Sequence, residues 1–241
     1  MEKLFLRRRI GVLFCFVGII TILSAISVWI LQPMRETALY DAKLPVLIID
    51  PGHGGEDGGA VAPDGTQEAD VNLSIAKRLN AIARLCGVRT VMTRASERID
   101  YPTEAQTIAE RKVADQKQRV ETINQTQGGV LISIHQNWYP ASSPHGAQVL
   151  YAGSSGSQEF GRFLHESLLK TLDPENRRVA SPISEEIYLM RSISCPAVLT
   201  ECGFLSNAND LSNLINPDYE LKLSMVMLSA YLQHFQTGWN Q

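Results

Sequence analysis

Short apolar runs alternate with longer segments of helical periodicity through most of this chain. Three runs are mostly aliphatic or β-branched and only a few residues long, as is typical of strands buried on both faces: 46–49, 130–134 and 197–200. Other segments place apolar residues on one stripe and predict helices over about 69–85, 103–125, 158–172 and 219–235. The alternation predicts a single α/β domain, with a mostly parallel twisted sheet flanked by helices on both faces.

Smaller elements complete the expected domain. Strands are expected at 88–93 and 146–151, and a short apolar piece lies at 187–190. Thr103 and Gln106 have the spacing of a capping box, so the polar helix is expected to begin at Thr103. Cys86 closes the apolar stripe of the first helix and is expected to pack in the core. The residues of the polar helix expected to face the core are Ile108, Val120 and Ile123.

The N-terminal residues have a different pattern. A basic cluster, Lys3 and Arg7 to Arg9, precedes an apolar run from Ile10 to Leu31. As a helix this run would span about 33 Å, close to the thickness of the hydrocarbon core of a bilayer. We therefore expect four parts: a cytoplasmic basic segment at 1–9, a transmembrane signal anchor at 10–32, a linker at 33–44 and the α/β domain at 45–238.

The alternative for this segment is a cleaved signal peptide. Such a peptide would have a shorter apolar core followed by a small-x-small cleavage site. The residues that follow, Trp29-Ile30-Leu31-Gln32-Pro33-Met34, contain no such site. The charge bias places the basic end inside the cell, so the domain is expected on the extracytoplasmic side of the cell membrane.

Composition and charge narrow the functional classes. The chain has 241 residues, a formal net charge of −3 and a pI of about 6.0. It has no basic patch with interleaved aromatic residues, so no nucleic-acid partner is expected. One of its four cysteines lies in the apolar run, which leaves an odd number in the domain, and no CxxC pair occurs. A disulfide scaffold and a cysteine-ligated structural zinc site are therefore both disfavoured.

Chemically active side chains follow the three apolar runs. The first run leads through Asp50-Pro51-Gly52 into His53, the second into His135 and the third into Glu201. Because parallel strands end at the same edge of a sheet, these side chains are expected in one cleft. Two histidines with a carboxylate indicate zinc chemistry. A dinucleotide-binding loop is the alternative after the first run, but Asp57 stands where that loop needs its third glycine.

Two glutamates have competing interpretations. Glu68, just ahead of the first helix, either favours the helix N-terminus by its charge or ligates the metal. Glu201, at the end of a buried strand, either acts as a general base or forms a structural salt bridge. Cys202 is a weaker candidate as a nucleophile, because no base remains to activate it once His53 and His135 bind metal. The other histidines are interpreted as surface or packing residues: His145, His165 and His234.

The motifs around these residues resemble the zinc-dependent N-acetylmuramoyl-L-alanine amidases of type 3. The resemblance covers about residues 45–237. The segments that carry it are Asp50-Pro51-Gly52-His53-Gly54-Gly55, Glu68 ahead of Asn72-Leu73, Ser133-Ile134-His135-Gln136-Asn137 and Glu201-Cys202-Gly203-Phe204-Leu205-Ser206-Asn207. By this likeness His53, Glu68 and His135 correspond to the zinc ligands, and Glu201 corresponds to the catalytic glutamate.

The resemblance implies hydrolysis of the amide bond between N-acetylmuramic acid and L-alanine in peptidoglycan. A narrower likeness, carried by 110–124, 187–190 and the N-terminal anchor, is to the germination-specific amidases of the spore cortex. Those enzymes trim peptides from muramic acid ahead of muramic-δ-lactam formation. An activating protein partner is also considered, although no residue identifies one. The alternatives are another zinc hydrolase of the cell wall, such as a peptidase or deacetylase, and a non-catalytic peptidoglycan-binding module.

Overall fold

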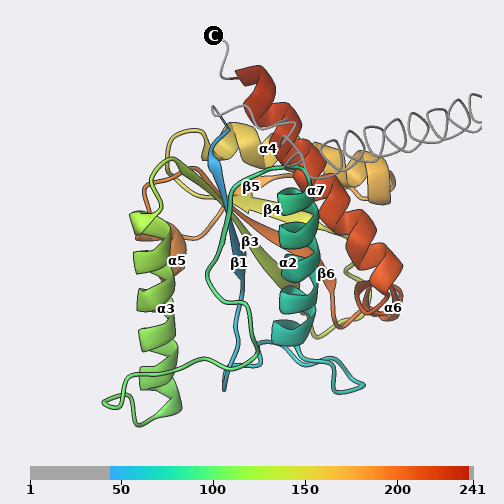
Figure 1. Ribbon diagram of the computed structural model, residues 1–241. Coiled ribbons are helices and arrows are strands. Elements are labelled where there is room, and N and C mark those ends of the chain that lie inside the picture. Colours follow the sequence, from blue (N-terminus) through green and yellow to red (C-terminus); the bar gives the residue numbers. More distant parts are fainter. Residues whose placement is uncertain (1–43, 239–241) are drawn as a thin grey trace, which may run out of the picture. The chain divides into compact units, whose positions relative to one another are not determined.

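A six-stranded sheet lies at the centre of residues 44–238, the part of the chain that the computed structural model describes (Figure 1). Its strand order is β2-β1-β3-β6-β4-β5. The strands are β1 Val46–Pro51, β2 Thr90–Met92, β3 Gly129–Asn137, β4 Gln148–Tyr151, β5 Ser181–Pro182 and β6 Ala197–Phe204. The first four strands in spatial order run parallel, which confirms the expectation of a mostly parallel sheet.

The strand β4 makes the sheet mixed, because it runs antiparallel to β6. The chain passes from β3 to β4 through a loop without a crossover helix, so it returns across the sheet from the edge at which β3 ended. As a result, Gln148 at the start of β4 lies beside Glu201 near the end of β6.

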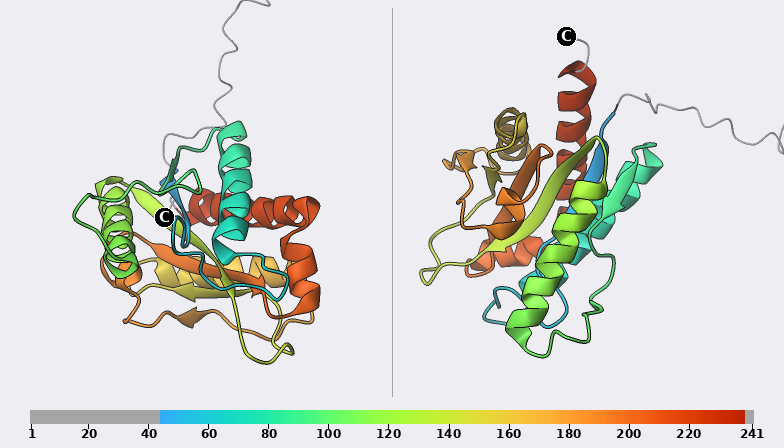
Figure 2. Two further views of the ribbon diagram at one scale, coloured as in Figure 1. Left: turned by 90° about the horizontal axis from the view of Figure 1, so that it is seen from below. Right: turned by 90° about the vertical axis from the view of Figure 1, so that its left-hand side faces the viewer.

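Helices cover both faces of the sheet, as expected (Figures 1 and 2). They are α2 Glu68–Leu85, α3 Ile108–Gln125, α4 Ser157–Leu172, α5 Tyr188–Arg191, α6 Ala208–Leu214 and α7 Pro217–Gly238. The larger core packs α2, α4 and α7 on one face, around residues such as Ile49, Ile132 and Val198. The smaller core lies on the other face, where α3 and α5 cover Ile48, Leu131 and Ala197.

The start of α3 corrects one prediction. The capping box is formed by Thr107 and Glu110, not by Thr103 and Gln106, so the helix begins at Ile108. The Glu110 carboxylate accepts hydrogen bonds from the backbone N–H groups of both Gln106 and Thr107, which fixes the entry of the chain into the helix. This first turn lies away from the core, so Ile108 is exposed, whereas Ile123 in the last turns is buried as expected.

Other local predictions also need correction. Cys86 is exposed and not in the core, because it is the C-terminal cap of α2 and follows the exposed Leu85. The apolar piece around 187–190 forms the single helical turn α5. The short elements β5 and α6 were not expected, since neither has enough residues for a clear periodic pattern.

The expected membrane anchor at 10–32, its basic flank and residues 33–43 of the linker lie outside the described residues. Between residues 44 and 238 no helix is long and apolar enough to cross a membrane.

Candidate active site

Three strands and one helix bring the predicted site residues to one edge of the sheet. His53 follows β1, His135 lies near the end of β3, and Glu68 is the first residue of α2. One ligand atom of each of these residues lies within 4.8 Å of those of the other two. Glu201 on β6 is the register partner of His135 on β3, so it borders the same cluster.

Glu68 holds the two histidines together. Its Oε1 lies 2.9 Å from His135 Nδ1 and its Oε2 lies 3.3 Å from His53 Nε2. The backbone N–H groups of Ala60 and Gln136 donate to the same carboxylate, so it is fixed in position. Glu68 therefore lies in the first turn of a helix and also faces the histidines, a position compatible with either of the roles considered for it in the sequence.

Glycines allow the backbone and the rings to approach closely. A side chain at position 52 would begin 2.2 Å from the His135 ring, and one at position 59 would begin 2.6 Å from Glu68 Oε2. His53 itself has a φ of 58°, in the left-handed region that non-glycine residues seldom adopt. Strain of this kind persists where the surroundings over-determine the conformation, which is common at functional sites.

A second layer orients His53. The Oδ2 atom of Asp57 lies 3.0 Å from His53 Nδ1 and also 3.0 Å from Nζ of Lys112 on α3. This leaves Nε2 of His53 facing Glu68, and a carboxylate behind a histidine is the usual support for a metal ligand. Two histidines and a carboxylate with one open side form the donor set of a catalytic zinc site, so these residues fit a zinc ion.

The electrostatics of the cluster agree with this arrangement. Burial by itself lowers the pKa of His53, but the hydrogen bonds and charges of Asp57 and Glu68 outweigh burial and raise it to about 9. Burial by itself raises the pKa of Glu68, yet His135 and His53 hold it well below its ordinary value. The charged form of His53 is thus favoured between the carboxylates of Asp57 and Glu68.

Glu201 differs from the other buried charges, because its Oε2 atom is buried and has no hydrogen-bond partner. Among the described residues it forms no ion pair, which argues against the structural salt bridge considered in the sequence. Burial raises the pKa of Glu201 to about 7, and the charge of Glu68 adds to the shift. A carboxylate in this state is suited to accepting and returning a proton near neutral pH.

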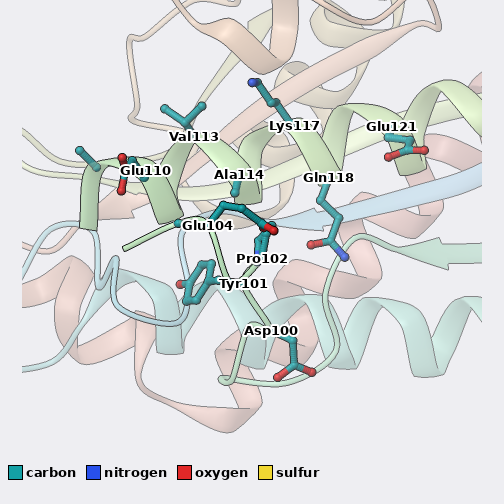
Figure 3. A pocket seen from close by; sticks show the side chains of 12 residues that line it. Asp100, Tyr101, Pro102, Glu104, Glu110, Val113, Ala114, Lys117, Gln118 and Glu121 are labelled. Carbon is teal, nitrogen blue, oxygen red and sulfur yellow. The ribbon is translucent and has the colours of Figure 1, made fainter. Parts of the chain in front are cut away.

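The cluster opens into a cleft of about 330 Å³ between α3 and the segment around α5. His53, His135 and Glu201 line it, and its walls include Lys112 from α3 and Met190 from α5. A larger groove of about 930 Å³ runs along a different face of α3, beside residues 100–105 (Figure 3). None of the four site residues lines that groove, so the smaller cleft is the candidate active site.

Comparison with known proteins assigns the chain to a family. The family model Amidase_3, described as N-acetylmuramoyl-L-alanine amidase, matches residues 47–230. This chain belongs to that family. Its enzyme activity is that of an N-acetylmuramoyl-L-alanine amidase acting on peptidoglycan, which confirms the activity predicted from the sequence. The match favours the amidase over the peptidase, deacetylase and binding-module alternatives.

The relatives add detail. The chain is 34% identical to the germination-specific N-acetylmuramoyl-L-alanine amidase of Bacillus subtilis (strain 168) over 191 residues, which cover 79% of each protein. It is 28% identical to the amidase LytC of the same organism, over 79% of this chain and 35% of LytC. The CwlD amidase from Clostridioides difficile, solved in complex with the GerS lipoprotein, is 31% identical with a TM-score of 0.75, over 80% of this chain and 98% of CwlD.

Several residues of the site were missed in the sequence. Asp57 lies four residues after His53 in a glycine-rich loop, a spacing that could have indicated its role. Lys112 had no such signal, because its contact depends on how α3 docks. Cys202 packs in the larger core and does not line the cleft, and burial raises the pKa of its thiol, which argues against a nucleophile. The three other histidines lie outside the cluster, as interpreted: His145, His165 and His234.

The buried Glu201 predicts a pH-dependent stability for the metal-free amidase. Its folded-state pKa of about 7 lies above the ordinary 4.5, so ionising Glu201 opposes folding. The cost is absent below about pH 4.5, grows between 4.5 and 7, and is complete above 7. Relative to wild type, Glu201→Gln should therefore gain about 3 kcal/mol of unfolding free energy between pH 4 and pH 8. Urea unfolding with chelator present measures it.

The exposed Glu166→Gln on α4 provides the matched control and should show no such trend. If the difference in unfolding free energy between Glu201→Gln and wild type does not change with pH, the raised pKa of Glu201 in the folded state is contradicted.

Proposed function

We propose that this amidase is zinc-dependent, with the ion held by His53, Glu68 and His135. The support is the convergence of their ligand atoms within 4.8 Å, the histidine–carboxylate donor set and the Asp57 carboxylate behind His53. Zn²⁺ bound by these residues would supply a Lewis acid, which activates water and polarises the scissile carbonyl.

Glu201 is the proposed general base. The observation that carries this role is its buried Oε2, which has no hydrogen-bond partner and lies beside the three proposed ligands. In its carboxylate form Glu201 would take a proton from the attacking water. It would then deliver that proton to the leaving nitrogen of L-alanine, which completes hydrolysis of the amide. Its pKa of about 7 suits Glu201 both to accept the proton and to return it.

The first prediction of this proposal concerns zinc and activity together. Purified residues 34–241 should contain about one zinc per chain by elemental analysis. His53→Ala and His135→Ala should lose the ion, whereas His145→Ala, which removes an exposed histidine, should retain it. Glu201→Gln should keep zinc but release peptides from isolated peptidoglycan roughly 10²–10⁴-fold more slowly.

Muropeptide mass spectrometry after digestion measures the product. Full zinc occupancy in both histidine variants would contradict the proposal that His53 and His135 bind the ion. Loss of zinc from Glu201→Gln would indicate that Glu201 is a ligand.

We also propose a role in the maturation of the spore cortex. The 34% identical relative is a germination-specific amidase, and the similar CwlD amidase was solved with a lipoprotein. By analogy, this chain would strip peptides from muramic acid ahead of muramic-δ-lactam formation, and a lipoprotein would be its activating partner. Such a partner would lie at the same membrane surface as an anchored amidase.

This role predicts a cortex phenotype in a spore-forming host. Spores of a strain without the chain should lack muramic-δ-lactam in their muropeptide profile. Expression of wild type should restore the lactam and Glu201→Gln should not. Normal lactam content in the deletion strain would exclude the cortex role while leaving the amidase activity intact. Digestion by the purified chain alone tests the need for an activating partner.

The last part of the proposal is the location of the amidase: a single transmembrane anchor at 10–32 holds the catalytic domain, 45–238, outside the cytoplasmic membrane. It is supported by the basic residues ahead of the apolar run and by the location of peptidoglycan outside that membrane.

The proposed anchor predicts that the full chain sediments with membranes at its full length. Its domain should be open to protease added to the outer face of the membrane. A chain that starts near Leu44 should remain soluble and still hydrolyse isolated peptidoglycan. Recovery of a shortened soluble chain from cells would instead indicate a cleaved signal peptide.

A further inference from the structure

Arg178 lies beside the proposed active site and has no role in it so far. It belongs to the segment between α4 and β5 and reaches over the neighbouring strands. Its NH1 group donates to Gln148 Oε1 at 3.1 Å, and its Nε–H donates to the carbonyl of His145 at 3.0 Å. Its guanidinium carbon lies 4.5 Å from the centre of the Phe204 ring.

The strand register places Gln148, the hydrogen-bond partner of this guanidinium, next to Glu201. Gln148 pairs with Glu201, and Glu201 pairs with His135. Directly paired residues on neighbouring strands project from the same face of a sheet, so these three side chains form one row. Arg178 is bonded to the end of this row. Its charge also acts on Glu201 and favours the carboxylate form, against the larger opposing effect of burial.

In the described part of the chain Arg178 has no carboxylate partner, in contrast to the two cations that line the cleft, Lys112 and Arg119. Lys112 pairs with Asp57, and Arg119 pairs with Asp50 and Asp115. Among residues 44–238 no carboxylate lies within 4.0 Å of the Arg178 guanidinium, whose three partners are a carbonyl, a side-chain amide and an aromatic ring. Its NH2 group makes no hydrogen bond to any described residue.

An arginine braced in this way is ready to bind an anion. Its neutral acceptors and the stacked ring fix the planar fork without neutralising it, so little conformational freedom remains to be lost on binding. A carboxylate is the group that such a fork recognises best.

We propose that Arg178 is a specificity-determining residue that binds a carboxylate of the peptide being released. The peptide continues beyond L-alanine into glutamate, whose α-carboxylate is either free or amidated in peptidoglycan. In this proposal the scissile amide lies at Glu201, and the α-carboxylate of the glutamate binds Arg178 at the end of the row that contains Glu201. The inference rests on the proposed role of Glu201, and it means that the amidase prefers the free acid over the amide.

A pair of muramoyl peptides tests it: N-acetylmuramoyl-L-Ala-D-Glu-peptide and the same compound with the α-carboxylate amidated. Wild type should have the higher kcat/KM on the free acid. Arg178→Gln should lower the value on the free acid about 10- to 100-fold more than it lowers the value on the amidated substrate, the effect of losing a charged hydrogen bond. Arg177→Gln is the matched control, because Arg177 is exposed and paired with Glu175 at 3.1 Å, and it should behave as wild type.

If Arg178→Gln lowers kcat/KM equally on both substrates, the proposal is overturned. Arg178 would then only hold Gln148 and Glu201 in position. Equal kcat/KM values for Arg178→Gln and wild type would overturn it as well. Calorimetry on Glu201→Gln, with and without Arg178→Gln, measures the dissociation constants of both peptides in the absence of turnover. If Glu201→Gln binds the free acid more tightly than the amide, and this preference disappears when Arg178→Gln is added, the proposed role of Arg178 is supported. If wild type hydrolysed neither peptide, that result would contradict the proposed function and not the role of Arg178 in binding.

Discussion

Two buried arginines hold the backbone turn on which the site depends. Arg119 bonds the Asp50 carboxylate at 2.8 Å and donates to the carbonyls of Pro51 and His53. Arg94 donates to the carbonyls of Pro51 and Gly52, both at 3.0 Å. These carbonyls lie where the chain leaves the sheet and enters a turn with positive φ at His53, and polar backbone groups of this kind need hydrogen-bond partners. Removing one partner of a buried pair costs roughly 3–5 kcal/mol, so this network holds His53 in its strained conformation.

The same network explains why two carboxylates of the site, Asp50 and Glu201, differ in their pKa. Burial by itself raises the pKa of Asp50, but Arg119 and the hydroxyls of Ser133 and Thr93 satisfy the carboxylate and lower it. Glu201 is partly exposed, but its Oε2 atom is buried without a hydrogen-bond partner, and its pKa rises to about 7. The fold therefore favours the ionised form of Asp50, which is part of the scaffold. It leaves Glu201 as the carboxylate that can exchange a proton near neutral pH.

The two faces of the sheet have different roles: one carries the larger core and the other carries the cleft. On one face α2, α4 and α7 bury an extensive core, which makes that side a rigid support. On the other face the core is smaller, and the space between α3 and the segment around α5 is the cleft. Residues at alternate positions of β3 and β6 point to that face, from Leu131 and Ala197 in the core to His135 and Glu201 in the cleft. A change of register by one residue would turn both site residues toward the core of the opposite face.

The sequence by itself determined the α/β class, the three central strands and the convergence of His53, His135 and Glu201, because each rests on a local pattern and on the shared edge of parallel strands. It left the role of Glu68 open, since that role depends on where α2 docks. The sequence did not reveal the Asp50–Arg119 hydrogen bond, because the two residues are 69 positions apart. Arg119 is also one of many polar residues in its helix, so the apolar periodicity does not single it out. The direction of β4 and the bond from Arg178 to Gln148, the strand neighbour of Glu201, were likewise decided by strand pairing and docking between distant segments, which only the tertiary structure determines.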